Sequence, residues 1–199
     1  MPPPGGTLWT TSHYCGFNLG TDGCPAGYEL LEVDGTQMRV RFKAIGEPDT
    51  FQMRFYDMNA VKSFWDSDSK VAALVASNSA YSYAKLFGSY TPNTVLLNVF
   101  MGDLRGRLAK VEIFENGTPL AVSNADAFDP QHVASYDVLA YSSDGSVNSS
   151  YKSVACSHIY RAVTSSATSP VTAKVTDREG RVYTASLTRP KEFNSKTRY

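Results

Sequence analysis

The stretch YELLEVDGTQMRVRFKAI, residues 28–45, decides the class of fold. Within it, Met38, Val40 and Phe42 alternate with polar residues, which is the period of a strand that has one face in solvent. Asp34-Gly35 separates two such runs, and this pair is typical of a type I′ turn, in which both central residues have positive φ. The sequence therefore predicts a β-hairpin.

Further strand patterns follow toward the C-terminus. Residues 51–56 repeat the alternation and predict a third antiparallel strand beside the hairpin. The apolar run TVLLNVFM, residues 94–101, is short enough for a strand that is buried on both faces. An Asn116-Gly117 turn within residues 107–122 and a second turn within residues 171–187 predict two more hairpins.

Two other regions break the strand pattern. Between residues 59 and 83, apolar residues fall at helical spacing, and the Asp and Ser residues before Lys70 are suitable N-caps, so one or two short helices are predicted. Residues 123–157 are rich in Ser, Asn, Asp and Gly. They predict a long surface loop that contains one strand at residues 136–140.

The sum of these patterns is a mainly β fold. Short strands, turns at regular intervals and no alternation of strands with helices predict an antiparallel β-sandwich of immunoglobulin-like or fibronectin-like character. Residues 1–27 show no strand or helix period and are interpreted as an irregular N-terminal arm. The sandwich would span residues 28–190, with a boundary between two subdomains near residues 88–92, and residues 191–199 would form a C-terminal tail.

The charge balance and hydropathy of the 199 residues argue against several classes of function. The 19 basic and 19 acidic residues cancel, so nucleic acid is not an expected partner. No run approaches the roughly 18 apolar residues of a membrane-spanning helix. The first six residues, MPPPGG, lack the basic and apolar segments of a signal peptide.

The three cysteines leave two interpretations open. Cys15, Cys24 and Cys156 can all be reduced and partly buried, because a cysteine that forms no disulfide behaves as a small hydrophobe. Alternatively, Cys15 and Cys24 form a disulfide in an exported protein. Their spacing does not match the close cysteine pairs of structural zinc sites, so no metal is predicted.

The sequence offers little support for catalysis. His13, His132 and His158 lie far apart in the sequence and are expected to be hydrogen-bonded structural or surface residues. A Ser-His-Asp triad could be assembled from residues that are distant in the sequence, but no Gly-x-Ser-x-Gly motif supports one. Glycine-rich loops of the phosphate-binding kind are missing as well. No catalytic residue and no cofactor is therefore predicted.

Aromatic residues in the N-terminal arm are the best candidates for contacts with a substrate or partner. Trp9, His13, Tyr14 and Phe17 lie in a segment without regular pattern. Aromatic side chains on such segments can bind sugars or partner surfaces, or they can fix the segment onto the fold. Both interpretations stay open.

Eight short phrases, in order along nearly the whole chain, are shared with one known family. They lie at residues 27–35, 38–43, 52–56, 97–100, 111–117, 128–130, 157–161 and 175–184. With these phrases the chain resembles the C-terminal accessory domain of bacterial calcineurin-like metallophosphoesterases. The catalytic domains of that family carry D-x-H, G-D-x-x-D, G-N-H-[DE] and G-H-x-H motifs that hold two metal ions, and these motifs do not occur here.

The resemblance implies a non-catalytic module that serves a metallophosphoesterase catalytic domain, in cis or in trans. Such a module would pack on that domain or gate its substrate opening, and the N-terminal arm would lie at the join. The resemblance also implies a periplasmic or extracellular setting, which suits a Cys15–Cys24 disulfide. The alternative function is a β-sandwich that binds carbohydrate or another surface through the exposed aromatic residues.

Overall fold

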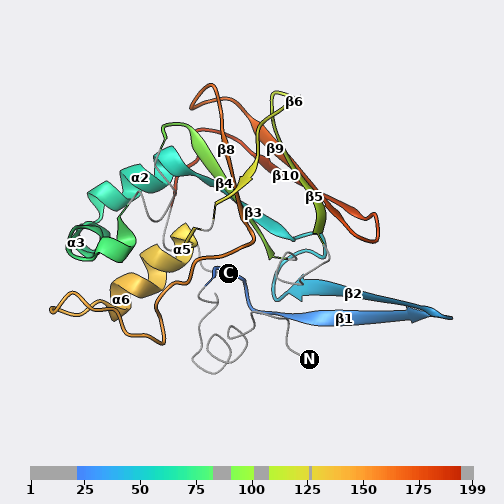
Figure 1. Cartoon of the computed structure of the whole chain (residues 1–199), viewed down its shortest axis with the longest axis horizontal. Helices are drawn as coiled ribbons and strands as arrows, with labels where there is room; N and C mark the ends of the chain where they lie inside the picture. Colours follow the sequence, from blue (N-terminus) through green and yellow to red (C-terminus); the bar gives the residue numbers. More distant parts are fainter. Residues whose placement is uncertain (1–21, 83–90, 101–107, 126, 194–199) are drawn as a thin grey trace.

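A computed structural model describes residues 22–82, 91–100, 108–125 and 127–193. In this part of the chain, two four-stranded antiparallel sheets lie beside a group of helices, and a two-stranded hairpin projects from one end (Figure 1). Strands account for 39% of the structure against 22% for helices, which confirms the predicted mainly β, antiparallel fold.

The central sheet contains two strands that are buried on both faces. Its strand order is β3 (Met53–Asp57), β4 (Thr94–Val99), β8 (Ile159–Val163) and β7 (Ser123–Asn124), and all neighbours are antiparallel. Every residue of β3 and β4 is buried. The uninterrupted apolar run at residues 94–101 predicted a strand that is buried on both faces. Strand β4 confirms this prediction, since neither of its faces meets solvent.

The second sheet covers one face of the central sheet. Its order is β10 (Val182–Leu187), β9 (Val171–Asp177), β5 (Leu108–Glu115) and β6 (Thr118–Pro119). Side chains from both sheets form one core, whose buried members are Met53, Phe55, Val95, Leu97, Val99, Ile113, Ala162, Val171, Ala173, Val175 and Leu187. The hairpins predicted within residues 107–122 and 171–187 are confirmed by the pairs β5–β6 and β9–β10.

The Asn116-Gly117 turn follows its prediction in detail. Asn116 has φ 50° and Gly117 has φ 79°. Two consecutive positive φ values define the type I′ turn that suits a two-residue hairpin, and Asn and Gly adopt them at least cost.

Helices cover the other face of the central sheet. Helix α2 (Met58–Ser67) begins after Asp57 and α3 (Ser69–Ser77) begins after Asp68, and each of these aspartates accepts a hydrogen bond from the first turn of its helix. A short 3-10 turn, η1 (Ser79–Tyr81), follows. Their apolar sides form a second core with Tyr56, Leu96 and Ile159 from the central sheet, which confirms the predicted helices.

The predicted strand at residues 136–140 is wrong. The chain there is helical, in the order α5 (Pro130–His132), a π-helical turn η3 (Val133–Asp137) and α6 (Val138–Ala140). Asp129 caps this segment by accepting hydrogen bonds from the backbone N–H groups of Gln131 and His132, at 3.0 and 2.9 Å. Asp-Pro is a helix-start signal, because proline fits the first helical position.

The prediction of a long surface loop at residues 123–157 is wrong for the helical residues 130–140. Four residues of η3 are buried, and Val133 and Ala134 belong to the core beneath the helices. The segment is therefore part of the helical layer.

The first hairpin is confirmed, but its turn and its neighbours differ from the prediction. Strands β1 (Gly27–Asp34) and β2 (Gln37–Ala44) pair so that Gly35 and Thr36 are the central turn residues. Only Gly35 has positive φ, 57°, so the turn is of the type II′ kind rather than I′. Strand β3 pairs with β4 and not with this hairpin, which forms a sheet of its own.

The ends of the predicted domain are described only in part. Residues 22–27 of the arm lead into β1, and residues 191–193 of the tail follow the second sheet. The ring of Phe193 packs 5.2 Å from that of Phe64, so the beginning of the tail belongs to the helical layer. The boundary predicted near residues 88–92 lies mostly outside the described residues and stays a prediction.

Candidate functional site

A tight turn just before β1 places two functional side chains close together. Gly23 has φ 79°, and a Cβ atom at this position would lie 2.1 Å from Cγ of Asp129. Both the left-handed backbone and the close approach require glycine here. The backbone N–H of Cys24 donates to Oδ1 of Asp22 at 2.9 Å, which fixes the carboxylate against the turn.

His158 reaches this turn from the other end of the chain. It lies directly before β8 and is 3% exposed. Its Nε2 atom is 3.2 Å from Oδ2 of Asp22, and its Nδ1 atom is 2.7 Å from Oδ1 of Asn98 in β4. The imidazole is thus held on both sides.

The hydrogen bonds of Asn98 determine which nitrogen of His158 carries a proton. The amide nitrogen of Asn98 donates to the carbonyl oxygen of Asp22 at 3.1 Å and to Oδ2 of Asp129 at 2.9 Å. Because both partners are acceptors, the NH2 group of Asn98 must point at them, and its Oδ1 faces His158. Nδ1 of His158 is therefore the donor, and Nε2 is directed at Asp22.

Asp129 anchors the far end of this network. Its Oδ2 also accepts a hydrogen bond from the hydroxyl of Tyr56 at 2.6 Å. Burial raises the pKa of Tyr56 well above its ordinary value, so the phenol keeps its proton and remains a donor. The network is a continuous set of buried hydrogen bonds from β3 through β4 to the turn before β1.

Asp22, Cys24 and His158, which we call the Asp22 cluster, are the candidate functional site. One donor atom from each lies within 4.8 Å of the other two. Asp22 and His158 are buried, whereas Cys24 is partly exposed, so the cluster can be reached from solvent. No other group of three or more metal-ligating side chains occurs in the described part of the chain. The cluster offers oxygen, sulfur and nitrogen ligands.

A second histidine lies in a Ser-His-Asp group that does not have the geometry of a catalytic triad. Nδ1 of His132 is 2.7 Å from Oγ of Ser153 and 3.4 Å from Oδ1 of Asp137. In a triad the serine and the aspartate contact opposite nitrogens, whereas here they share one. All three residues are also buried. The group therefore joins η3 to the following loop.

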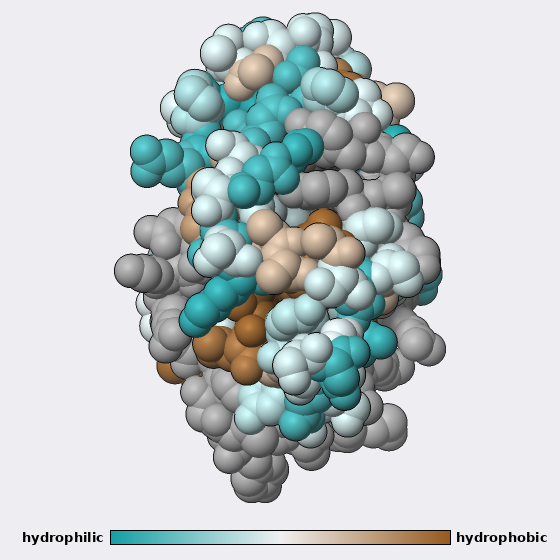
Figure 2. Space-filling view, turned by 90° about the vertical axis from the view of Figure 1, so that its left-hand side faces the viewer, coloured by the Kyte–Doolittle hydropathy of each residue, from teal (hydrophilic) through white to brown (hydrophobic). Residues whose placement is uncertain are grey.

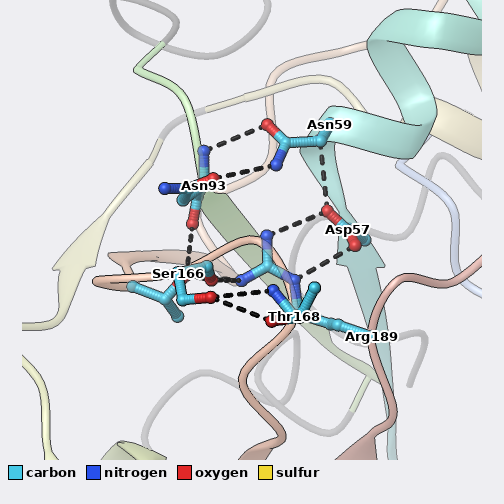
Figure 3. Close-up of polar contacts among 7 residues, drawn as sticks. Asp57, Asn59, Asn93, Ser166, Thr168 and Arg189 are labelled. Atoms are coloured by element: carbon cyan, nitrogen blue, oxygen red, sulfur yellow. Dashed lines mark hydrogen bonds and ion pairs between the residues drawn. The ribbon is translucent and has the colours of Figure 1, made fainter.

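A third polar cluster fixes the end of β10 to the start of α2 (Figure 3). Arg189 donates to both carboxylate oxygens of Asp57, at 3.1 Å each, and to the carbonyl oxygen of Ser166 at 3.1 Å. Asp57 also caps α2, and the Asn59 side chain exchanges hydrogen bonds with Asn93. The Asp57 and Arg189 side chains are almost fully buried, so this is a structural ion pair.

The candidates predicted from sequence are located as follows. Trp9, His13, Tyr14 and Phe17 lie outside the described residues, and so does Cys15, so the contact and disulfide predictions stay predictions. His132 and His158 are both hydrogen-bonded, as expected, and both are buried rather than on the surface.

Sequence reasoning missed the Asp22 cluster because its members are distant in the chain. Asp22 was not singled out, and Cys24 and His158 are separated by the whole fold. The one local signal is the Asp-Gly-Cys sequence of residues 22–24, in which a short acidic side chain and a thiol flank a glycine.

Comparison with known families identifies the chain. The fold is a β-rich module with a projecting hairpin and a polar cluster at the base of that hairpin. The family model described as C terminal of calcineurin-like phosphoesterase matches residues 4–183, and the chain belongs to this family. No curated protein and no solved structure gives a significant match.

Proposed function

We propose that the chain is a non-catalytic module that packs on a calcineurin-like phosphoesterase domain through one face of the β1–β2 hairpin. Family membership supports a phosphoesterase domain as the partner, since the matched model is the C-terminal part of such enzymes. The observation that carries the proposal is the apolar, solvent-facing surface of the hairpin.

Side-chain exposure on the hairpin shows this surface. Leu31, Val33 and Met38 are 57%, 64% and 66% exposed. Strand register puts them on one face, because Val33 lies opposite Met38 and side chains two residues apart in a strand point the same way. We call this set the hairpin face.

Among the described residues, no second layer packs on this two-stranded sheet, which makes it an unusual place for exposed apolar side chains. Isolated hairpins are marginally stable in water, and three exposed apolar side chains on one side add a cost that a partner surface would remove. The hairpin also follows directly on the N-terminal arm, where the family's catalytic domain would join. A docked catalytic domain would therefore cover the hairpin face.

The helical end of the molecule is a weaker candidate surface. Figure 2 shows this end, where hydrophilic residues surround an apolar area. Leu139 of α6 is the one large hydrophobic side chain of the described helices that is highly exposed, at 65%. A single exposed leucine is common on protein surfaces, whereas three on one sheet face are not.

None of the described helices is long and apolar enough to cross a membrane. The periplasmic or extracellular setting stays a prediction from the resemblance, and the exclusion of nucleic acid stays a prediction from the balanced charge. Carbohydrate binding remains the alternative function, and its aromatic candidates lie outside the described residues.

The proposal is tested by adding the chain to a calcineurin-like catalytic domain from the same genome and measuring affinity, thermal shift and phosphoesterase turnover. The double variant Leu31→Thr/Val33→Thr keeps strand-forming residues but removes apolar area. Affinity should fall about tenfold or more, which corresponds to roughly 1.4 kcal/mol. Val182→Thr, at a site on β10 that is 49% exposed, is the matched control and should bind normally.

Turnover separates packing from gating. If the module gates the substrate opening, its addition changes kcat/KM, and the double variant loses that change. If it only packs, the catalytic domain gains thermal stability with unchanged kinetics. Absence of any binding, together with retention by a glycan array, would replace the proposal with the carbohydrate-binding alternative.

A further inference from the structure

We propose that the Asp22 cluster is a binding site for one divalent transition-metal ion of the zinc type. The ligands would be Oδ2 of Asp22, Sγ of Cys24 and Nε2 of His158. This site belongs to the accessory module itself, and it does not depend on whether the hairpin face binds a catalytic domain.

The orientation of His158 is that of a metal ligand. Metal-binding histidines nearly always donate the N–H of the second ring nitrogen to a carbonyl or carboxylate oxygen, which fixes the tautomer and aims the other nitrogen at the metal. Asn98 has this role here, because its Oδ1 accepts from Nδ1 at 2.7 Å. In the neutral imidazole, Nε2 directs its lone pair toward the Asp22 carboxylate, and a metal cation between the two atoms satisfies both.

The distances agree with tetrahedral coordination. Bonds of about 2.0–2.1 Å to nitrogen and oxygen put two tetrahedral ligands about 3.3 Å apart. Nε2 of His158 and Oδ2 of Asp22 are 3.2 Å apart. Sγ of Cys24 lies within 4.8 Å of a ligand atom of each of these two residues, so a small side-chain rotation would complete a three-ligand site.

The surrounding structure holds the ligands in place. The carbonyl oxygen of Asp22 accepts hydrogen bonds from Asn98 and from the thiol of Cys156, the latter at 3.2 Å. The left-handed Gly23 sets the direction of the chain between the two ligands. Such positioning lowers the cost of binding, because little ordering is left to be done.

The ligand set selects the class of metal. Calcium and magnesium prefer oxygen ligands only, while a thiolate and an imidazole together favour zinc and its first-row neighbours. Three protein ligands leave a fourth position for water, and the partial exposure of Cys24 gives access from solvent. On binding, the thiol of Cys24 releases its proton to solvent as the metal–sulfur bond forms.

A bound ion would fix the turn before β1 to the residue before β8. The hairpin begins three residues after Cys24, so the metal would hold the base of the hairpin against the central sheet. A Cys15–Cys24 disulfide would consume the same sulfur atom. Metal binding and this disulfide are therefore mutually exclusive states of Cys24.

Cobalt and zinc titrations of the chelator-treated, chemically reduced chain test the proposal. Co²⁺ should bind one ion per chain and give the charge-transfer absorption of a cobalt–thiolate bond, and Zn²⁺ should displace it and raise the melting temperature. Cys24→Ser should abolish the thiolate absorption, and Asp22→Asn should weaken zinc binding about 100-fold or more. The control variant Cys15→Ser should retain both the absorption and the affinity.

Two results would overturn the proposal. One is the failure of the reduced wild-type chain to bind either ion. The other is a cobalt–thiolate absorption that persists in Cys24→Ser, or a zinc affinity that is unchanged in Asp22→Asn, while circular dichroism shows that both variants are folded.

Discussion

The central sheet and the β1–β2 hairpin use the same kinds of apolar side chain in opposite surroundings. Every residue of β4 is buried between two layers, whereas Leu31 and Val33 on the hairpin are 57% and 64% exposed. Burial of apolar area is what stabilises a fold, so the two regions should differ sharply in their response to substitution. Leucine and valine therefore stabilise the module in the central sheet. On the hairpin the same residue types stay exposed, where a partner could cover them.

The largest effect is expected where the central sheet ends in a buried ion pair. Asp57→Asn keeps the helix cap of α2 but leaves the guanidinium of Arg189 without its carboxylate. Removing one partner of a buried pair costs about 3–5 kcal/mol. Urea unfolding measures this loss.

The control for this substitution is an exposed ion pair on α2. Asp66 pairs with Lys62 on the helix surface, and its side chain is 49% exposed. Asp66→Asn should change the free energy of unfolding by less than about 0.5 kcal/mol. Equal losses in the two variants would contradict the assignment of Asp57 and Arg189 as a buried structural pair.

A matched pair of leucine substitutions compares the two regions directly. Leu97→Ala in β4 removes a fully buried side chain from the core between the sheets and should cost about 2–5 kcal/mol. Leu31→Ala on the hairpin removes a largely exposed side chain and should cost less than about 1 kcal/mol in the isolated chain. Thermal or urea unfolding of both variants checks this.

Binding of a catalytic domain should increase the small effect of Leu31→Ala. In the presence of a bound catalytic domain, Leu31→Ala should destabilise the complex more than it destabilises the isolated chain. A loss in the isolated chain as large as that of Leu97→Ala would mean that the hairpin face is already covered.

The same comparison explains how much of the fold the sequence could predict. Strand period and turn residues are local signals, and they predicted β1, β2, β4 and the two C-terminal hairpins. Which strands share a sheet depends on contacts between distant segments, so the pairing of β3 with β4 instead of the hairpin was missed. The segment after Asp129-Pro130 was misjudged because its strand-forming residues outweighed a helix-start signal.

The candidate site shows the limit of prediction more plainly. Cys24 was recognised as chemically interesting, and one of its two open interpretations paired it with Cys15, which is near in sequence. Its neighbour in space is His158, which reaches it only because the central sheet brings the start of β8 next to the turn before β1. A cluster built from such separated residues has no spacing pattern to read.

The smallest expected effect on stability is a pH-dependent one at the end of strand β5 in the second sheet. Glu115, the last residue of β5, accepts hydrogen bonds from the backbone N–H and the hydroxyl of Ser165, at 2.9 Å each. The backbone hydrogen bond is the main cause that lowers the pKa of Glu115 below its ordinary value of 4.5. A lowered folded-state pKa stabilises the fold above the unfolded-state pKa, and this contribution is lost as pH falls through the folded-state value.

Glu115→Gln should therefore cost about 1 kcal/mol at neutral pH, because an amide oxygen accepts these hydrogen bonds less strongly than a carboxylate. The gap between wild type and variant should narrow as the pH is lowered below 4.5, the ordinary value for this carboxyl group. Urea unfolding at a series of pH values measures it, and Glu29→Gln on the exposed hairpin should change stability by less than about 0.5 kcal/mol. A gap for Glu115→Gln that stays constant with pH would show that shape rather than charge matters at this position. The negative charge of Glu115 would then contribute little to stability, although its hydrogen bonds would still matter.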